Sequence, residues 1–210
     1  MLIRVLTLLV LISAALTIYA ETRGPRRNVY LFKPLTTALI ILIALQTKFA
    51  VSPFYRWMIV AGLVCSLAGD IFLMLPRDRF IQGLVSFLFA HIFYIAAFTS
   101  EGAHTLSVPI IFPFLIHGGA MLRLLWPSLG KLKLPVVIYM LIILLMAVQA
   151  TSRFISTREM GSALAFVGAL LFTASDSILA VDRFRGPVKS AQFLILSTYF
   201  VAQWLIALST

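Results

Sequence analysis

The stretch 62–75, GLVCSLAGDIFLML, is almost wholly apolar and carries one carboxylate, Asp70. A second stretch of the same character, 168–181 (GALLFTASDSILAV), carries Asp176. A charged side chain at the centre of a membrane helix costs about 2.5–3.5 kcal/mol on insertion scales, and such residues are usually functional. The two segments therefore predict a pair of membrane helices that meet at a polar centre.

The composition of the whole chain is that of a membrane protein. Of its 210 residues, 61% are hydrophobic and 11% are charged, whereas soluble domains carry about 25% charged residues. A transmembrane helix needs roughly 20 mostly apolar residues. We expect an all-α, polytopic bundle of eight transmembrane helices in a single transmembrane domain, 1–210. The eight stretches lie near 2–20, 29–47, 57–76, 80–100, 105–122, 134–152, 160–181 and 189–209.

The two halves of the chain resemble each other weakly. Leu39-Ile-Ile-Leu precedes Gln46 as Leu141-Ile-Ile-Leu precedes Gln149, and each intramembrane aspartate is followed by an Asp-Arg-Phe triplet. These matches favour a 4+4 internal repeat with halves 1–104 and 105–210. The two copies would run in the same sense, because each contains an even number of helices.

Positive charge is concentrated in alternate connections between the expected helices. Twelve of the 17 Lys and Arg lie in or beside the first, third, fifth and seventh connections, and five lie on the opposite side. Because positive residues stay cytoplasmic, we expect an integral protein of the bacterial inner membrane with both termini outside the cytoplasm. The charges form no patch with interleaved aromatic residues, so nucleic acid is not an expected partner.

Four chemically active groups fall at one level of the membrane. Asp70 and Asp176 each lie six residues before a polar boundary, about 9 Å at 1.5 Å per residue. His117 lies six residues before Arg123, and Lys33 opens its helix from the same side. Small side chains precede both aspartates at helical spacing and mark close helix contacts. Both carboxyl groups should therefore face the bundle interior.

Polar faces on two further helices should wall a cavity around these groups. We take Asp70 and Asp176 as the catalytic candidates and expect them to face one cavity, roughly 5–10 Å apart, as catalytic carboxylate pairs are. Each candidate also has a purely structural interpretation, as a hydrogen-bonding partner between helices. The substrate-binding candidates are Lys33, His91, Tyr94, His117, Tyr199 and Gln203.

The residue types indicate acid–base chemistry. The sequence has no G-x-S-x-G elbow, no H-E-x-x-H and no glycine-rich phosphate loop. Its single cysteine, Cys65, excludes disulfides and cysteine zinc sites. We expect neither a metal site nor a cofactor. Two buried carboxyl groups can share one proton and divide the roles of acid and base.

Motifs spread along the chain resemble those of the YhhN-like lysoplasmalogenases. The resemblance covers nearly the whole chain and keeps the order of the motifs. It implies an eight-helix membrane enzyme that hydrolyses the vinyl ether of lysoplasmalogens to a fatty aldehyde and a glycerophospho-alcohol. The matching residues are Lys33-Pro-Leu-Thr-Thr37, Ser66-Leu-Ala-Gly-Asp70-Ile-Phe-Leu-Met74, Phe80, Gly83, Phe87, Ala90-His91, Tyr94, Ser175-Asp176 and Leu179-Ala180.

The candidate residues suit that reaction. An acid protonates the terminal alkene carbon of the vinyl ether, water adds to the oxocarbenium ion, and the hemiacetal collapses. Two carboxyl groups suffice for these steps, by analogy with glycosidases. We expect a lysophospholipid substrate that enters from the surrounding membrane lipid, with its phosphate near Lys33 and near Arg77 or Arg183.

Two other functions use a similar pair of aspartates. An intramembrane aspartyl protease does so, but Leu67-Ala-Gly-Asp70 lacks the first glycine of the G-x-G-D pattern. A proton-coupled transporter or lipid-binding membrane protein would carry protons on the aspartates or bind a cationic head group. Transporter sites lie near the bilayer midplane, so two aspartates near one face favour the hydrolase.

The first prediction concerns topology. Reporter fusions at residue 1 and at residue 210 should both report a location outside the cytoplasm, because most of the basic residues lie on the other side. A fusion in the 183–189 connection serves as the internal control and should report the cytoplasm. A cytoplasmic C-terminus would contradict the assignment of sides.

Overall fold

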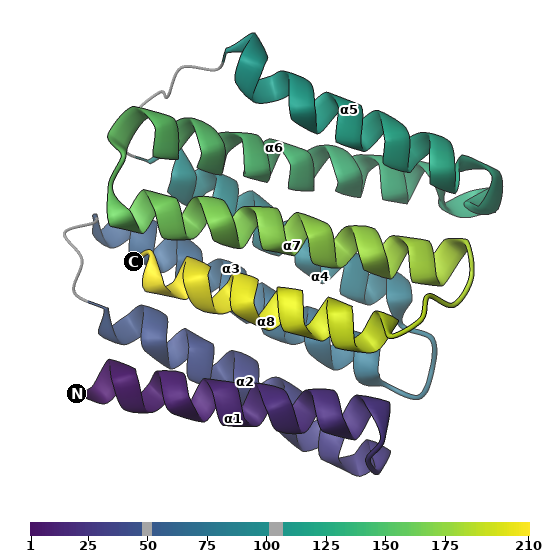
Figure 1. The fold of residues 1–210 in the computed structure, drawn as a ribbon, viewed down its shortest axis with the longest axis horizontal. Coiled ribbons are helices and arrows are strands. Elements are labelled where there is room, and N and C mark those ends of the chain that lie inside the picture. The colour runs from purple at the N-terminus through teal and green to yellow at the C-terminus, as the bar shows by residue number, and fades with distance from the viewer. Residues whose placement is uncertain (48–51, 101–106) are drawn as a thin grey trace.

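The computed structural model describes residues 1–47, 52–100 and 107–210, which form helices and short connections with no strand among them (Figure 1). The described helices include eight that are long and apolar enough to cross a membrane, so the predicted all-α membrane bundle is confirmed. The proposed boundary between halves, at 104/105, lies outside the described residues. The helices are α1 Leu2–Thr22, α2 Arg26–Gln46, α3 Pro53–Met74, α4 Phe80–Phe98, α5 Val108–Leu125, η1 Trp126–Ser128, η2 Gly130–Leu132, α6 Lys133–Thr157, α7 Met160–Phe184 and α8 Ala191–Leu208.

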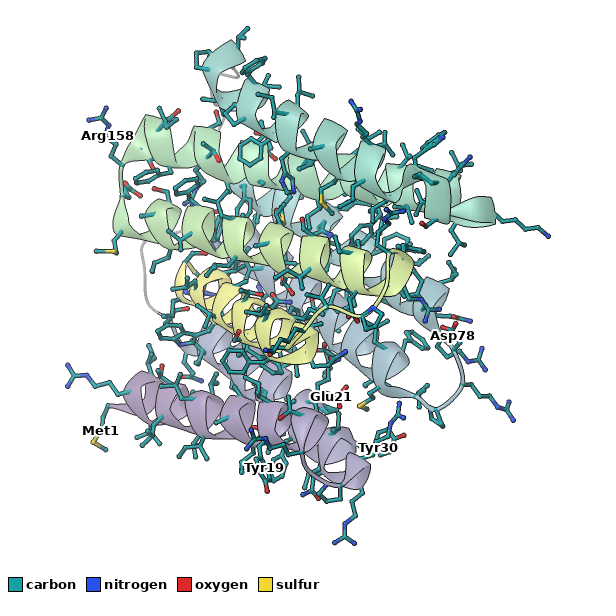
Figure 2. All side chains as sticks on the ribbon, turned by 45° about the vertical axis from the view of Figure 1, so that its right-hand side comes forward. Met1, Tyr19, Glu21, Tyr30, Asp78 and Arg158 are labelled. Carbon is teal, nitrogen blue, oxygen red and sulfur yellow. The ribbon has the colours of Figure 1, made fainter. Side chains whose placement is uncertain are left out.

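The long helices lie roughly side by side in two layers. One layer runs in the order α1, α2, α8, α7, α6, α5, and α3 and α4 pack behind it against α2, α8 and α6 (Figure 1). Both termini lie at the same end of the bundle. Figure 2 shows Met1 and Arg158 at that end and Asp78 at the opposite end. The predicted basic connections therefore share one end, as alternate connections must.

Two helices extend by four or more residues beyond the stretches that hydropathy alone predicts. α3 begins at Pro53 rather than near 57, because the Ser52 hydroxyl accepts a hydrogen bond of 3.2 Å from the Tyr55 amide and proline suits the first helical position. α6 continues to Thr157 rather than ending near 152. Arg153 permits this extension, since its side chain is 1% exposed and its guanidinium lies 4.5 Å from the centre of the Tyr55 ring.

Glycines on α3 let α4 approach closely and place two aromatic rings of α4 directly against the α3 backbone. A Cβ atom at Gly62 would lie 2.3 Å from the Tyr94 ring, and one at Gly69 would lie 2.6 Å from the Phe87 ring. No real Cβ atom tolerates such distances, so only glycine fits at these positions. This close packing follows the general use of small residues at membrane helix contacts.

Candidate functional site

Asp70 is a fully enclosed carboxylate with three partners from two other helices. Thr37 of α2 and Tyr199 of α8 each donate a hydrogen bond of 2.7 Å to its Oδ2 atom. The Lys33 ammonium of α2 lies 3.6 Å from Oδ1. Because the carboxylate is only 1% exposed, its charge is balanced by Lys33 and not by water. These contacts join α2, α3 and α8.

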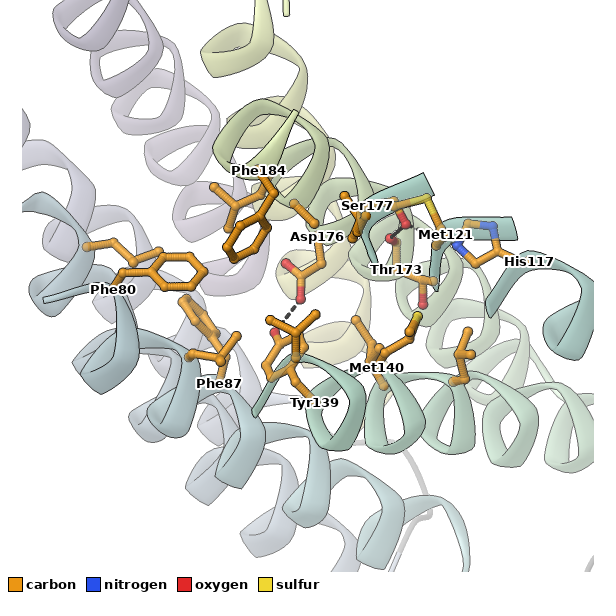
Figure 3. Close-up of a pocket in the computed structure, with 18 residues that line it drawn as sticks. Phe80, Phe87, His117, Met121, Tyr139, Met140, Thr173, Asp176, Ser177 and Phe184 are labelled. Carbon is orange, nitrogen blue, oxygen red and sulfur yellow. Dashed lines mark hydrogen bonds between the residues drawn. The ribbon is translucent and has the colours of Figure 1, made fainter. Parts of the chain in front are cut away.

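Asp176 has a different environment, since it lines a cavity. Its Oδ2 atom accepts a hydrogen bond from the Tyr139 hydroxyl of α6 (Figure 3). The cavity has a volume of about 70 Å³, which is well below the roughly 300–1,000 Å³ of a site for a drug-sized ligand. It lies among α3 to α7, and most of its wall is apolar. The polar residues in its described wall are His117, Tyr139, Thr173, Asp176 and Ser177.

A hydrogen bond joins α5 and α7 at one side of the cavity wall. The His117 Nε2 atom lies 3.0 Å from the Ser177 Oγ atom, and the Ser177 hydroxyl donates a bond of 2.7 Å to the Thr173 carbonyl. A serine hydroxyl carries one proton, so Nε2 of His117 must be the donor in this pair. The imidazole therefore has a defined orientation at the cavity wall.

The cavity reaches the end of the bundle that carries the basic connections. Phe80 and Phe184 form its wall there, with ring centres 5.7 Å apart. The Arg183 guanidinium lies 5.0 Å from the centre of the Phe80 ring and 2.5 Å from a carboxylate oxygen of Asp78. This hydrogen bond from Arg183, together with one from the Phe80 amide, holds the pKa of Asp78 below its ordinary value. A cation therefore lies beside the mouth of the cavity.

A cluster of aromatic rings connects the environments of the two aspartates. Tyr199, the partner of Asp70, packs edge-on against Phe87 and Phe172, with ring centres 5.8 and 5.5 Å apart. His91 lies 4.7 Å from Phe172 and 5.3 Å from Tyr139, the partner of Asp176. Each carboxylate thus accepts a hydrogen bond from a tyrosine, and the two tyrosines belong to one packed cluster.

The structure corrects the expectation that both carboxyl groups face one cavity. Asp176 lines the cavity, but Asp70 is not among its lining residues. The reason is that the Asp70 oxygens are turned toward α2 and α8, where their donors lie. The ring cluster therefore connects the surroundings of the two carboxyl groups, and the two groups do not face a common cavity.

The six substrate-binding candidates also lie in two different places, inside and outside the cavity wall. His117 lines the cavity, whereas the remaining five do not and lie in a buried polar layer beside it. Tyr94 donates a hydrogen bond of 2.7 Å to the Gln203 amide oxygen, and His91 is fully buried among rings. The candidates in this layer are Lys33, His91, Tyr94, Tyr199 and Gln203.

Sequence reasoning missed three contributors: Tyr139, Thr37 and Ser177. Thr37 follows Lys33 by four residues, so both side chains face the same way on α2, and this spacing could have revealed it. Tyr139 is the one hydroxyl-bearing aromatic residue in the apolar run of α6, at the same depth as Asp176. Ser177 carried no signal of its own, because its role depends on the position of α5.

Comparisons with known proteins show the family of the chain. The profile of the YhhN family matches residues 28–210. The chain belongs to the YhhN family. It is 29% identical over 202 residues to the uncharacterized membrane protein YhhN of Escherichia coli O6:H1, with 95% of each chain covered. This confirms the resemblance seen in the motifs and identifies an integral membrane protein.

Two named relatives come from mammals. The chain is 34% identical over 188 residues to human lysoplasmalogenase TMEM86B, which covers 88% of this chain and 78% of the relative. It is 36% identical over 159 residues to bovine lysoplasmalogenase TMEM86A, which covers 72% of this chain and 64% of the relative. No solved structure matches the chain.

The second prediction tests the charge pair at Asp70. Lys33→Met should lower stability by about 3 kcal/mol, because removing one partner leaves an uncompensated buried charge. Adding Asp70→Asn to that variant should restore part of the loss. Lys189→Met, at an exposed lysine, is the control and should be neutral. Unfolding of the purified protein in detergent measures all four proteins, and a neutral Lys33→Met variant would show that the pair has no structural role.

Proposed function

We propose that this protein is a membrane hydrolase that cleaves the vinyl ether bond of lysoplasmalogen-type lysophospholipids. The observation that carries the proposal is a carboxyl group, Asp176, in an apolar cavity that begins at the basic end of the bundle. Relatives named lysoplasmalogenases support the substrate class. The products would be a fatty aldehyde and a glycerophospho-alcohol.

In the proposed mechanism Asp176 acts first as the acid and then as the base. Its Oδ2 atom accepts the Tyr139 hydrogen bond, which leaves Oδ1 for the transferable proton. That proton moves to the alkene carbon that does not bear oxygen, and the electron pair of the ether oxygen forms the oxocarbenium ion. Water adds to the cationic carbon and returns a proton to the Asp176 carboxylate. The hemiacetal then breaks into aldehyde and alcohol.

Asp70 takes a positioning role in this proposal. It fixes the hydroxyl of Tyr199, and the Tyr199 ring packs against Phe87, a residue of the cavity wall. Tyr139 is held by the same cluster through His91. Loss of the Asp70 charge would therefore disturb the orientation of Tyr139 and the cavity wall, without removing the proton donor. In this mechanism only Asp176 contacts the substrate, whereas the sequence predicted that both carboxyl groups would do so.

The phosphate of the substrate would bind near Arg183. This cation lies beside Phe80 at the cavity mouth, and its ion pair with Asp78 can be exchanged for an ion pair with phosphate. The lysolipid would enter from the cytoplasmic leaflet of the bacterial inner membrane, with both protein termini on the other side. Lys33 is less suited to bind the phosphate, because it is paired with Asp70.

The third prediction tests the chemistry. Purified protein should release aldehyde from lysoplasmalogen and none from the saturated ether analogue. Asp176→Asn should lower the rate by about 10²–10⁴-fold, the usual effect of losing a positioned acid or base. Tyr139→Phe should lower it about tenfold, the equivalent of one hydrogen bond. Glu159→Gln, at the far end of α7, is the control and should retain the wild-type rate.

The role of Asp70 can be separated from that of Asp176 in the same assay. Asp70→Asn should lower kcat but keep the pH–rate profile of the wild type, because Asp176 remains the titrating acid. Asp176→Glu should shift the pH–rate profile along the pH axis, because Asp176 is the titrating acid. If Asp70→Asn instead changes the profile and abolishes the rate as fully as Asp176→Asn does, both carboxyl groups take part in proton transfer. Near-normal aldehyde release by Asp176→Asn would disprove the mechanism.

The fourth prediction concerns the head group. Arg183→Gln should raise KM about tenfold with little change in kcat, because a phosphate contact is made equally in the ground state and the transition state. Arg23→Gln, at an exposed residue that does not line the cavity, is the matched control. Steady-state kinetics of aldehyde release measure both variants. An unchanged KM in Arg183→Gln would place the phosphate elsewhere.

A further inference from the structure

A second hollow lies on α5, α6 and α7, next to the cavity that holds Asp176. Its wall includes Ile110 and Phe114 of α5, Ile155 of α6, and Phe166 and Leu170 of α7. Leu170 is 37% exposed and Ile155 is 49% exposed, so this groove opens on the outer surface of the bundle. It faces the part of the membrane that holds lipid chains.

The groove adjoins the cavity. His117 and Thr173 belong to the walls of both. On α7, groove and cavity are lined by one helical stripe, 166, 170, 173, 177, 180 and 184, with steps of three or four residues. Such steps place residues on a single helix face. The two hollows therefore follow each other along the same face of α7.

From the basic end of the bundle, the cavity comes first and the groove second, as the head-group end of a lysolipid is followed by its hydrocarbon chain. The cavity lies toward the basic end of the bundle, where Phe80 and Phe184 form its mouth. The groove lies on the other side of Asp176, between Thr173 and Phe166. Thr173 and Phe166 are seven residues apart on α7, which corresponds to about 10 Å at 1.5 Å per residue. A chain that passes Asp176 from the mouth would continue into the groove.

The wall of the groove suits hydrocarbon. Its threonine hydroxyls are turned back onto their own helices, where Thr151 donates to the Ala147 carbonyl at 2.7 Å and Thr173 donates to the Ala169 carbonyl at 2.9 Å. Phe166 is the last residue of the groove along α7 and stacks on Phe154, with ring centres 5.2 Å apart. The described wall thus offers mostly apolar contact along its length.

We propose that the groove between α5 and α7 is the binding site for the hydrocarbon chain of the lysolipid, which enters it from the cavity past His117 and Thr173. The proposal rests on the proposed function for the identity of the lipid. It adds a site that measures chain length, because the chain meets Phe166 about 10 Å beyond Thr173. The hydrogen bond between His117 and Ser177 marks the threshold between the two compartments.

Chain-length dependence gives the first test. Leu170→Trp fills the groove and should lower kcat/KM about tenfold for a long-chain lysoplasmalogen, the effect of losing about two buried methylenes. It should leave a short-chain lysoplasmalogen almost unaffected. Val167→Trp, a residue of α7 that is 43% exposed and outside both hollows, is the matched control. An equal loss for both chain lengths, or no loss in Leu170→Trp, overturns the proposal.

Photo-crosslinking gives a second test that does not require hydrolysis. The probe is a saturated-ether lysophospholipid with a photoreactive group at the end of its chain, applied to the wild-type protein in vesicles. The label should fall on residues 109–114 and 166–170 and should be displaced by unlabelled lysolipid but not by diacyl phospholipid. Labelling spread evenly over the lipid-facing helices overturns the groove, even if the same protein releases aldehyde from lysoplasmalogen in a separate assay. Specific labelling, with no aldehyde released from lysoplasmalogen in the separate assay, would support the groove and disprove the proposed hydrolase activity.

Discussion

A carboxylate enclosed in a membrane protein needs a counter-charge and hydrogen-bond donors, and the interaction of Asp70 with Lys33 meets this need. Taking a charge out of water is costly unless it is paired and fully hydrogen-bonded. Thr37 and Tyr199 complete the set of donors. These partners come from α2 and α8. The need of the Asp70 side chain on α3 for a counter-charge and donors therefore fixes how the three helices pack.

The ring cluster carries this constraint from Asp70 to the cavity. Tyr199 is held by Asp70, Phe172 packs on Tyr199, and His91 packs between Phe172 and Tyr139. Aromatic rings in edge-on contact have defined geometry, and close-packed interiors transmit small displacements. The orientation of Tyr139 toward Asp176 therefore depends on a carboxylate that does not line the cavity.

The two aspartates consequently have unequal surroundings, and this inequality is the basis of the proposed mechanism. Asp70 has a cation and two donors, so it is suited to remain charged and fixed. Asp176 has one phenolic donor and an apolar cavity around it, so it is suited to exchange a proton with a substrate. Different environments commonly give two similar groups different roles in an active site.

The sequence by itself determined the number of membrane helices and the inward orientation of the aspartates. These properties depend on hydropathy along one segment and on helical periodicity, which are local. It also indicated that Lys33 belongs to the buried polar level of Asp70. The motifs around Asp70 and Asp176 were sufficient to show the family.

Only the tertiary structure decided which helices are neighbours, and therefore which residues meet each carboxylate. Every helix is similarly apolar, so the sequence pattern does not distinguish α6 from α8 as a partner. The choice depends on shape, such as the fit of the Phe87 ring against Gly69. The packing of the helices turns Asp70 toward α2 and α8 and brings Tyr139 to Asp176. As a result, one aspartate and not two lies in the cavity wall.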